Sequence, residues 1–198
     1  MIAIVNYGVG NIKSILKAIE LVGGRAVVTR DPDDIEKAKG IVLPGVGAFK
    51  TAMENMREIE KMIRETDVPV LGICLGMQLF ATESEEKGIH RGLNVIPGRV
   101  VRFPKEVGKI PHMGWNKIKI VKNHRILKGV KDNSYVYFVH SYYMITEDEY
   151  VLTKTEYTIE FASGVFRDNF VGFQFHPEKS GRTGLKIIKN FVDMCSAE

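Results

Sequence analysis

Cysteine, long apolar runs and blocks of like charge are all scarce in this 198-residue sequence. Its two cysteines, Cys74 and Cys195, argue against a disulfide framework and fit a reducing cytoplasm, which keeps a thiol available for chemistry. The apolar run at residues 1–5 is too short for a membrane span or a signal peptide, and it has no basic leader. Because the net charge is only +4, with no dense block of lysine and arginine, nucleic acid is not an expected partner.

What remains is the composition of an ordinary globular protein, 44% hydrophobic and 26% charged, and long enough for a single domain spanning residues 1–198. The first part of the chain alternates β-type and helical patterns. Strands are predicted at residues 2–6, 25–29, 40–43 and 69–73, with helices from Ile12, from Pro32 after an Asp31 N-cap, and at 48–64. This alternation predicts right-handed βαβ units and a parallel sheet.

The second part of the chain is rich in short β-type runs. They lie at residues 100–103, 117–121, 135–140, 151–155, 160–167 and 170–175. Asp168-Asn169 is typical of a hairpin turn, and residues 184–194 have the spacing of an amphipathic helix. The predicted fold class is therefore α/β, with a mostly parallel central sheet flanked by helices and a β-rich second half.

The most informative segment is VLGICLGMQL, at residues 70–79. An apolar β-type stretch ends in Cys74, with Gly72 and Gly76 on either side, and a helix-like stretch follows. This is the pattern of a nucleophile elbow, with sulfur in place of the serine oxygen. The start of a helix favours a thiolate, so Cys74 is a candidate nucleophile for acyl transfer. A small cysteine buried in the core explains the same run.

A thiolate needs a proton acceptor, and His176 is the best placed of the five histidines. It ends an apolar run, and ligand sites in open α/β sheets lie at the carboxyl ends of strands. Pro177 favours an extended backbone at His176, so Glu178 is expected on the same side, within reach of the ring. Cys74, His176 and Glu178 would then be nucleophile, base and orienting group. Taken alone, the His-Pro-Glu run is also explained by a surface turn.

Acyl transfer also needs donors for the oxyanion. In elbow enzymes one donor is the N–H of the residue after the nucleophile, here Leu75, and the other comes from a loop after an earlier strand. The PGVG run at residues 44–47 follows the third predicted strand and suits that role, although an ordinary strand-to-helix turn accounts for it equally well. Gln78 lies one helical turn beyond Cys74, where it could contact a polar substrate or solvent.

The GVGN run at residues 8–11 follows the first predicted strand, as a dinucleotide-binding loop would. Lys13 replaces the third glycine of that fingerprint, and no Gly-Lys-Ser/Thr phosphate loop occurs. We therefore expect a tight turn into a helix, and neither a cofactor nor a metal ion.

Over essentially its whole length the chain resembles the class I, or triad, glutamine amidotransferases. The pair GICLGMQ (72–78) and FHPE (175–178) is specific to that class. Within the class, further runs resemble the glutaminase subunits of imidazole glycerol phosphate synthase. These are NYGVGN (6–11), LPGVG (43–47), PHMGWN (111–116), YFVHSY (137–142) and EKS (178–180). No catalytic position departs from the family pattern.

The resemblance implies that Cys74 attacks the side-chain amide of L-glutamine, ammonia leaves, and water hydrolyses the glutamyl thioester to glutamate. His176 would shuttle the protons, and Glu178 would orient its ring. The implied oxyanion donors are the N–H groups of Val46, Gly47 and Leu75. The implied glutamine-holding groups are Gly47, Gln78, Glu86 and the backbone around His140, Ser141 and Tyr142.

The resemblance further implies a heterodimer with a (β/α)8-barrel cyclase subunit, which receives the ammonia through an internal tunnel. The cyclase uses it in histidine biosynthesis to make imidazole glycerol phosphate and aminoimidazole carboxamide ribotide. In this family the glutaminase is nearly silent without its partner. The positions implied to face the cyclase are Asn11, Trp115, Tyr137 and Lys179. Without the resemblance, the two aromatic residues would be assigned to the core and the lysine to the solvated surface.

Three other functions remain compatible with the sequence. Triad glutaminases of anthranilate, guanylate or pyridoxal phosphate synthesis share the chemistry but not the partner. A stand-alone cysteine peptidase or esterase would have the same elbow. A non-catalytic interaction protein would keep Cys74 as a core residue, and its function would survive Cys74→Ala.

Overall fold

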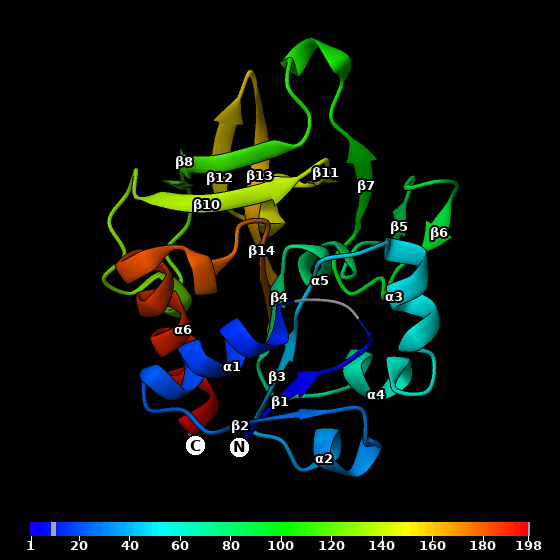
Figure 1. The fold of residues 1–198 in the computed structure, drawn as a ribbon, viewed down its shortest axis with the longest axis vertical. Coiled ribbons are helices and arrows are strands. Elements are labelled where there is room, and N and C mark those ends of the chain that lie inside the picture. Colours follow the sequence, from blue (N-terminus) through cyan, green and yellow to red (C-terminus); the bar gives the residue numbers. More distant parts are fainter. Residues whose placement is uncertain (9–10, 198) are drawn as a thin grey trace.

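The structure is a computed structural model that describes residues 1–8 and 11–197. Its centre is an eight-stranded sheet in the order β2-β1-β3-β4-β14-β13-β12-β9 (Figure 1). The strands from β2 to β14 run parallel, and the remaining pairs are antiparallel. They are β1 (Ile2–Val5), β2 (Ala26–Thr29), β3 (Gly40–Leu43), β4 (Val70–Ile73), β9 (Lys119–Ile120), β12 (Val151–Tyr157), β13 (Ile159–Arg167) and β14 (Phe170–Phe173).

Helices cover both faces of the parallel strands (Figure 1). On one face α1 (Ile12–Leu21) and α6 (Gly181–Ser196) share a core with Ile4 and Ile73. On the other, α3 (Phe49–Asn55) and α4 (Glu60–Arg64) share a core with Val5 and Leu43. Every residue of β1, β3, β4 and β14 is therefore buried, which explains their continuous apolar sequences. The short helix α2 (Pro32–Glu36) follows β2.

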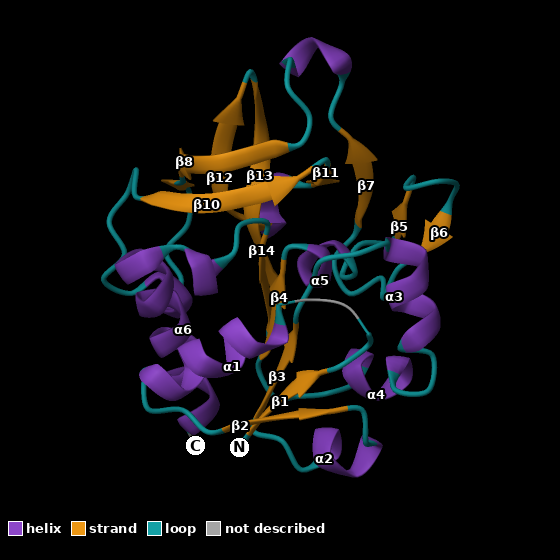
Figure 2. Ribbon diagram, viewed as in Figure 1, coloured by secondary structure: helices purple, strands orange, loops and turns teal. Residues whose placement is uncertain are grey.

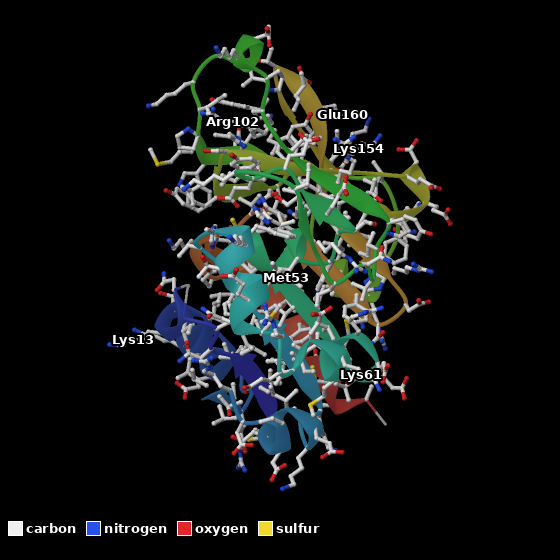
Figure 3. All side chains as sticks on the ribbon, turned by 90° about the vertical axis from the view of Figure 1, so that its right-hand side faces the viewer. Lys13, Met53, Lys61, Arg102, Lys154 and Glu160 are labelled. Carbon is white, nitrogen blue, oxygen red and sulfur yellow. The ribbon has the colours of Figure 1, made fainter. Side chains whose placement is uncertain are left out.

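Strands dominate the second half of the chain (Figure 2). A two-stranded antiparallel ribbon, β8–β10, lies beside a small sheet in the order β11-β7-β5-β6. These strands are β5 (Glu83–Ser84), β6 (His90–Arg91), β7 (Gly98–Arg102), β8 (His112–Lys117), β10 (Tyr135–His140) and β11 (Tyr142–Thr146). Lys154 of β12 and Glu160 of β13 form an ion pair of 3.3 Å in this half (Figure 3). No helix within the described residues is both long and apolar enough to cross a membrane.

The predicted α/β class is confirmed, and so are the first four strands, to within one residue at each end. The predicted cap is also correct, because the Asp31 side chain accepts a hydrogen bond of 2.9 Å from the N–H of Asp33. The hairpin at Asp168-Asn169 is formed, with Asp168 at a φ of 53° and Arg167 opposite Phe170. Val9 and Gly10 of the glycine-containing turn lie outside the described residues.

Two predicted elements are wrong. The single helix at 48–64 is two helices, because a turn between them, closed by the Ile59 N–H on the Met56 carbonyl at 2.9 Å, buries both of these side chains. The predicted strand at 117–121 is divided at Ile118, where the chain passes from β8, paired with β10, to β9, paired with β12. Local alternation does not specify a strand's partner, so the sequence could not show this crossing.

Candidate active site

Cys74 occupies a strained turn between β4 and α5 (Leu75–Gln78), with φ 52° and ψ −105°. A positive φ is unfavourable for a residue with a side chain, and such strain gathers at functional sites. Two glycines let the segments pack closely enough to hold the turn. A Cβ on Gly76 would lie 1.9 Å from the Leu43 carbonyl oxygen, and one on Gly72 would lie 2.7 Å from the Gly76 carbonyl. The elbow predicted from the sequence is therefore present in the structure.

The ring of His176 is fixed by Glu178. Its Nδ1 lies 2.8 Å from Glu178 Oε1, and both side chains are 1% exposed. His176 has the predicted extended backbone, with φ −101° and ψ 97°, but the chain does not stay extended as far as Glu178. Pro177 begins a 3₁₀ turn, η4 (Pro177–Lys179), since its fixed φ suits the first position of a helical turn. This turn, rather than strand geometry, brings the carboxylate to the ring.

The other ring nitrogen of His176, Nε2, is buried and has no hydrogen-bond partner that meets normal geometry among the described residues. Burial lowers the pKa of His176, but the nearby Cys74 sulfur and the hydrogen-bonded Glu178 carboxylate outweigh it and raise the pKa to about 10. Protonated His176 would place a positive charge beside the sulfur. This arrangement suits a thiolate–imidazolium pair.

Cys74 lies at the wall of a cavity of about 330 Å³. The structure brings together here the residues that the sequence analysis assigned to the oxyanion hole and to glutamine binding. Those lining the cavity are Val46, Gly47, Leu75, Gln78, Glu86, His140, Ser141 and Tyr142. Pro111 and Val139 complete the lining. The cavity therefore joins the elbow of the parallel sheet to the end of β10.

Glu86 and His140 already form hydrogen bonds to other groups of the protein. Glu86 Oε2 accepts a hydrogen bond of 2.9 Å from the N–H of Phe49, so it satisfies the first turn of α3. His140 uses both ring nitrogens, one with the Tyr142 carbonyl at 2.8 Å and one with His112 at 2.9 Å. The His140 ring therefore has no free nitrogen to offer to a ligand in the cavity.

The predicted oxyanion donors lie close together but are not all free. The N–H of Leu75 donates to the Gly45 carbonyl at 3.4 Å. Val46 is 41% exposed, and Gly47 has a φ of 130°, which a side chain would resist. The loop at residues 44–47 thus directs the Gly45 carbonyl toward the N–H of Leu75, the residue after Cys74.

Gln174 is a polar residue of the site that the sequence analysis missed. It is fully buried at the end of β14, and its Nε2 lies 3.5 Å from Cys74 Sγ. Gln78 Nε2 donates both to Gln174 Oε1 and to the Tyr142 carbonyl, each at 3.1 Å. The available signal was a glutamine inside an apolar strand, because a buried amide needs polar partners.

His112 lies in a chain of hydrogen bonds with His140. Asn116 Nδ2 lies 3.2 Å from His112 Nε2, and His112 Nδ1 lies 2.9 Å from His140 Nε2. Burial lowers the pKa of His112 to about 4. Burial also lowers the pKa of His140 to about 3, despite the hydrogen bond to Tyr142. Both rings are therefore neutral at pH 7, and they brace the end of β10.

Three of the four residues implied to face a partner gather on one surface. Trp115 and Tyr137 are paired across β8 and β10 with ring centroids 6.1 Å apart, and the Lys179 ammonium lies 5.9 Å from the Tyr137 ring centroid. Trp115 is 56% exposed, as is its neighbour Met113, so the tryptophan is not a core residue. Asn11 precedes α1.

Comparison with known proteins agrees with this geometry. The sequence model of the family described as glutamine amidotransferase class-I matches residues 3–195. The imidazole glycerol phosphate synthase subunit HisH of Archaeoglobus fulgidus is 63% identical over 194 residues, and that of Methanosarcina acetivorans is 49% identical over 199, each match covering 98% of both chains. A solved structure described as a glutamine amidotransferase has a TM-score of 0.78 at 19% identity, covers 99% of both chains, and shows the shared fold. The chain belongs to the class-I glutamine amidotransferase family, and within it to the HisH subunits of imidazole glycerol phosphate synthase.

Proposed function

We propose that this chain is the glutaminase subunit that hydrolyses L-glutamine to glutamate and ammonia at Cys74, as one domain working in a reducing cytoplasm. The observation that carries the proposal is the ring of His176, which Glu178 holds at 2.8 Å while its second nitrogen is left for the sulfur. The cavity of about 330 Å³ beside Cys74 suits a small polar substrate. The few polar groups in its wall, Gln78 and Glu86 among them, favour a ligand with an amide and an amino-acid end over an ester of a large alcohol.

In this mechanism the Cys74 sulfur attacks the side-chain carbonyl of glutamine, and the carbonyl oxygen becomes an oxyanion. Protonated His176 then gives its proton to the leaving nitrogen, so that ammonia departs and a glutamyl thioester remains. A water molecule loses its proton to His176 and attacks the thioester carbonyl. Collapse of the second tetrahedral intermediate releases glutamate and restores the sulfur. Glu178 stabilises each imidazolium that forms.

The loop at residues 44–47 supports regulation by a partner. Leu75, Val46 and Gly47 are the proposed oxyanion donors, yet the Leu75 N–H is taken by the Gly45 carbonyl. A change of the loop backbone that withdraws this carbonyl would release the donor. A partner that binds the rearranged loop more tightly would therefore activate the enzyme. If the free chain hydrolyses glutamine as fast as its complex, this part of the proposal fails.

The proposed partner is the (β/α)8-barrel cyclase, which receives the ammonia. The surface formed by Met113, Trp115, Tyr137 and Lys179 supports a partner on this face, because an exposed tryptophan beside a half-buried tyrosine and a cation is typical of binding surfaces. The cyclase would use the ammonia to form imidazole glycerol phosphate in histidine biosynthesis. The same cavity and triad serve any triad glutaminase, so this surface is what would distinguish the partner.

Replacement of the nucleophile tests the proposed reaction. We expect Cys74→Ala to abolish glutamine-dependent product formation by the complex and to leave ammonia-dependent formation within about twofold, because the cyclase site is untouched. Cys195→Ala is the matched control, since Cys195 packs against Gly40 in the core, and should retain glutamine turnover. Glutamine turnover that survives in the Cys74 variant would show that the sulfur is not the nucleophile.

A further inference from the structure

Gln174 contacts the reacting sulfur, yet the mechanism above gives it no part. It follows β14, is 0% exposed, and places its Nε2 3.5 Å from Cys74 Sγ. Its backbone N–H donates to the Ser163 carbonyl on β13 at 2.9 Å, which fixes the position of the main chain. A buried amide is costly unless its polar atoms find partners, so its neighbours decide what it does.

Those neighbours identify which amide atom faces the sulfur. The Tyr142 carbonyl can only accept, so the atom of Gln78 that lies 3.1 Å from it is the nitrogen. The same nitrogen lies 3.1 Å from Gln174, whose facing atom must therefore be the oxygen. The Nε2 of Gln174 is left to face Cys74. The hydrogen-bond network thus orients the donor toward the sulfur, rather than leaving the amide free to flip.

Two groups contact the sulfur with opposite preferences for its proton. The Val139 carbonyl lies 3.8 Å from Cys74 Sγ and can accept only from the thiol. An amide N–H is a stronger partner for an ionised acceptor than for a neutral one, so Gln174 favours the thiolate. The helix α5 is a single turn with few aligned peptide dipoles, so it stabilises a thiolate only weakly. A side-chain donor such as Gln174 therefore has a larger share in stabilising the thiolate.

We propose that Gln174 is a further catalytic residue whose side-chain N–H stabilises the Cys74 thiolate, and that Gln78 fixes its orientation. This inference rests on the proposed glutaminase function and deepens it. Gln78 and Tyr142 also line the cavity, so two amides connect the substrate site to the sulfur. The competing explanation is that Gln174 only braces Gln78 for substrate binding.

Two variants separate these roles. Gln174→Met removes the donor from the sulfur without adding charge. Gln174→Glu also removes the amide donor but keeps an acceptor for Gln78, so the substrate wall retains its support. Ser163→Ala is the control, because it removes a buried hydroxyl, bonded to Thr153 at 2.9 Å, from the adjacent strand without contacting the sulfur. All are made in a Cys195→Ala background, so that a single thiol is titrated.

The measurement is the pH dependence of thiolate absorbance and of alkylation by iodoacetamide. His176 and Tyr7 are the other titratable groups coupled to Cys74, and both stay in place in every variant. We expect the midpoint to rise by about one pH unit or more in both Gln174 variants and to stay unchanged in Ser163→Ala. In the complex, kcat for glutamine should fall roughly tenfold or more, while KM for Gln174→Glu stays within about threefold.

Two outcomes would overturn the proposal. One is an unchanged midpoint of the Cys74 titration in both Gln174 variants. This result overturns the proposal whether KM rises, as the bracing role predicts, or activity stays the same. The other is an equal shift in Ser163→Ala, which would assign the effect to packing. An unchanged thermal unfolding midpoint of the isolated chain shows that each variant is folded. If the parent complex does not hydrolyse glutamine, the proposed function fails, whereas the titration of Cys74 still decides the role of Gln174.

Discussion

Single residues of the elbow show how a few atoms set the geometry of the nucleophile. Cys74 holds a φ of 52°, and the close approach of α5 to β3 keeps it there. That approach depends on a missing side chain, because a Cβ at Gly76 would lie 1.9 Å from the Leu43 carbonyl oxygen. A backbone oxygen cannot rotate away as a flexible side chain would. The glycine therefore has a steric role that its sequence pattern only hints at.

We expect Gly76→Ala to lower the free energy of unfolding by roughly 1–3 kcal/mol and to reduce glutamine turnover by at least about tenfold. The physical reason is that α5 must move away from β3, which displaces Cys74 from His176. Urea denaturation and steady-state kinetics of the complex measure the two effects. Gly108→Ala is the control, because Gly108 has open space where a Cβ would be added, although its own φ, unlike that of Gly76, is positive at 92°. It should lose roughly 1–3 kcal/mol of stability to backbone strain but keep its activity, because it lies away from the elbow.

At the scale of elements, the ribbon of β8 and β10 forms part of the wall of the cavity beside Cys74. His112 and His140 are directly opposite each other in its register and joined by a hydrogen bond of 2.9 Å. The rings of Phe103, Phe138 and Phe161 surround them. In these surroundings a charged imidazole is unfavourable, so both rings depend on staying neutral.

This pair predicts a loss of stability in acid. The pKa of His112 is lowered to about 4 and that of His140 to about 3, so the unfolded chain binds more protons than the folded one between these values and about pH 6.5. Stability is therefore present above pH 6.5 and is lost as the pH falls. At 1.4 kcal/mol per pKa unit, His112 contributes at most about 3.5 kcal/mol to this loss. His176 has a raised pKa, so the stability that its proton contributes is lost as the pH rises. This loss falls mainly above pH 6.5, outside the range in which His112 and His140 act.

Substitution of His112 checks this account. We expect His112→Gln to be less stable than the parent at neutral pH, yet to lose less stability between about pH 6.5 and pH 4.5, since one of the two neutral imidazoles is gone. Urea midpoints across that range measure the slope. His90→Gln, on β6 of the small sheet, should leave the slope nearly as it is in the parent. A parental slope in His112→Gln would contradict the prediction.

At the scale of the whole molecule, the candidate active site is the place where the two halves of the chain meet. The parallel half supplies Cys74 and the loop at residues 44–47, and the end of β10 brings residues 139–142 to the same cavity. The outer surface of the ribbon is less buried, with Trp115 56% exposed. An exposed tryptophan contributes little to the fold of its own chain and is a common anchor in interfaces.

We expect Trp115→Ala to weaken binding of the cyclase by roughly 2 kcal/mol, or about thirtyfold, with little change in the melting temperature of the isolated chain. Titration calorimetry with the cyclase measures the first effect, and thermal unfolding the second. Ile145→Ala on β11 is the matched control, because Ile145 is a similarly exposed apolar residue, at 52%, away from the surface at Trp115. Equal losses of affinity in both variants would argue against a specific role for the tryptophan.

The sequence determined the α/β class, the order of the first strands and helices, and the elbow around Cys74, whereas most other residues of the cavity were expected only from the family resemblance. It could do so because buried parallel strands have continuous apolar runs, and because an elbow needs glycines at fixed spacing from its nucleophile. The apolar runs and the glycine spacing are local signals, because each involves residues that are close together in the sequence.

Only the tertiary structure decided how distant segments combine. The turn that divides α3 from α4, the passage from β8 to β9, and the contact of Gln174 with Cys74 all depend on which segments pack together. Gln174 and Cys74 are 100 positions apart in the chain. Hydrogen bonds and packing contacts between such distant residues leave no local pattern in the sequence. Their contribution to stability depends on how the folded chain brings the two residues together, not on which residues are neighbours in the sequence.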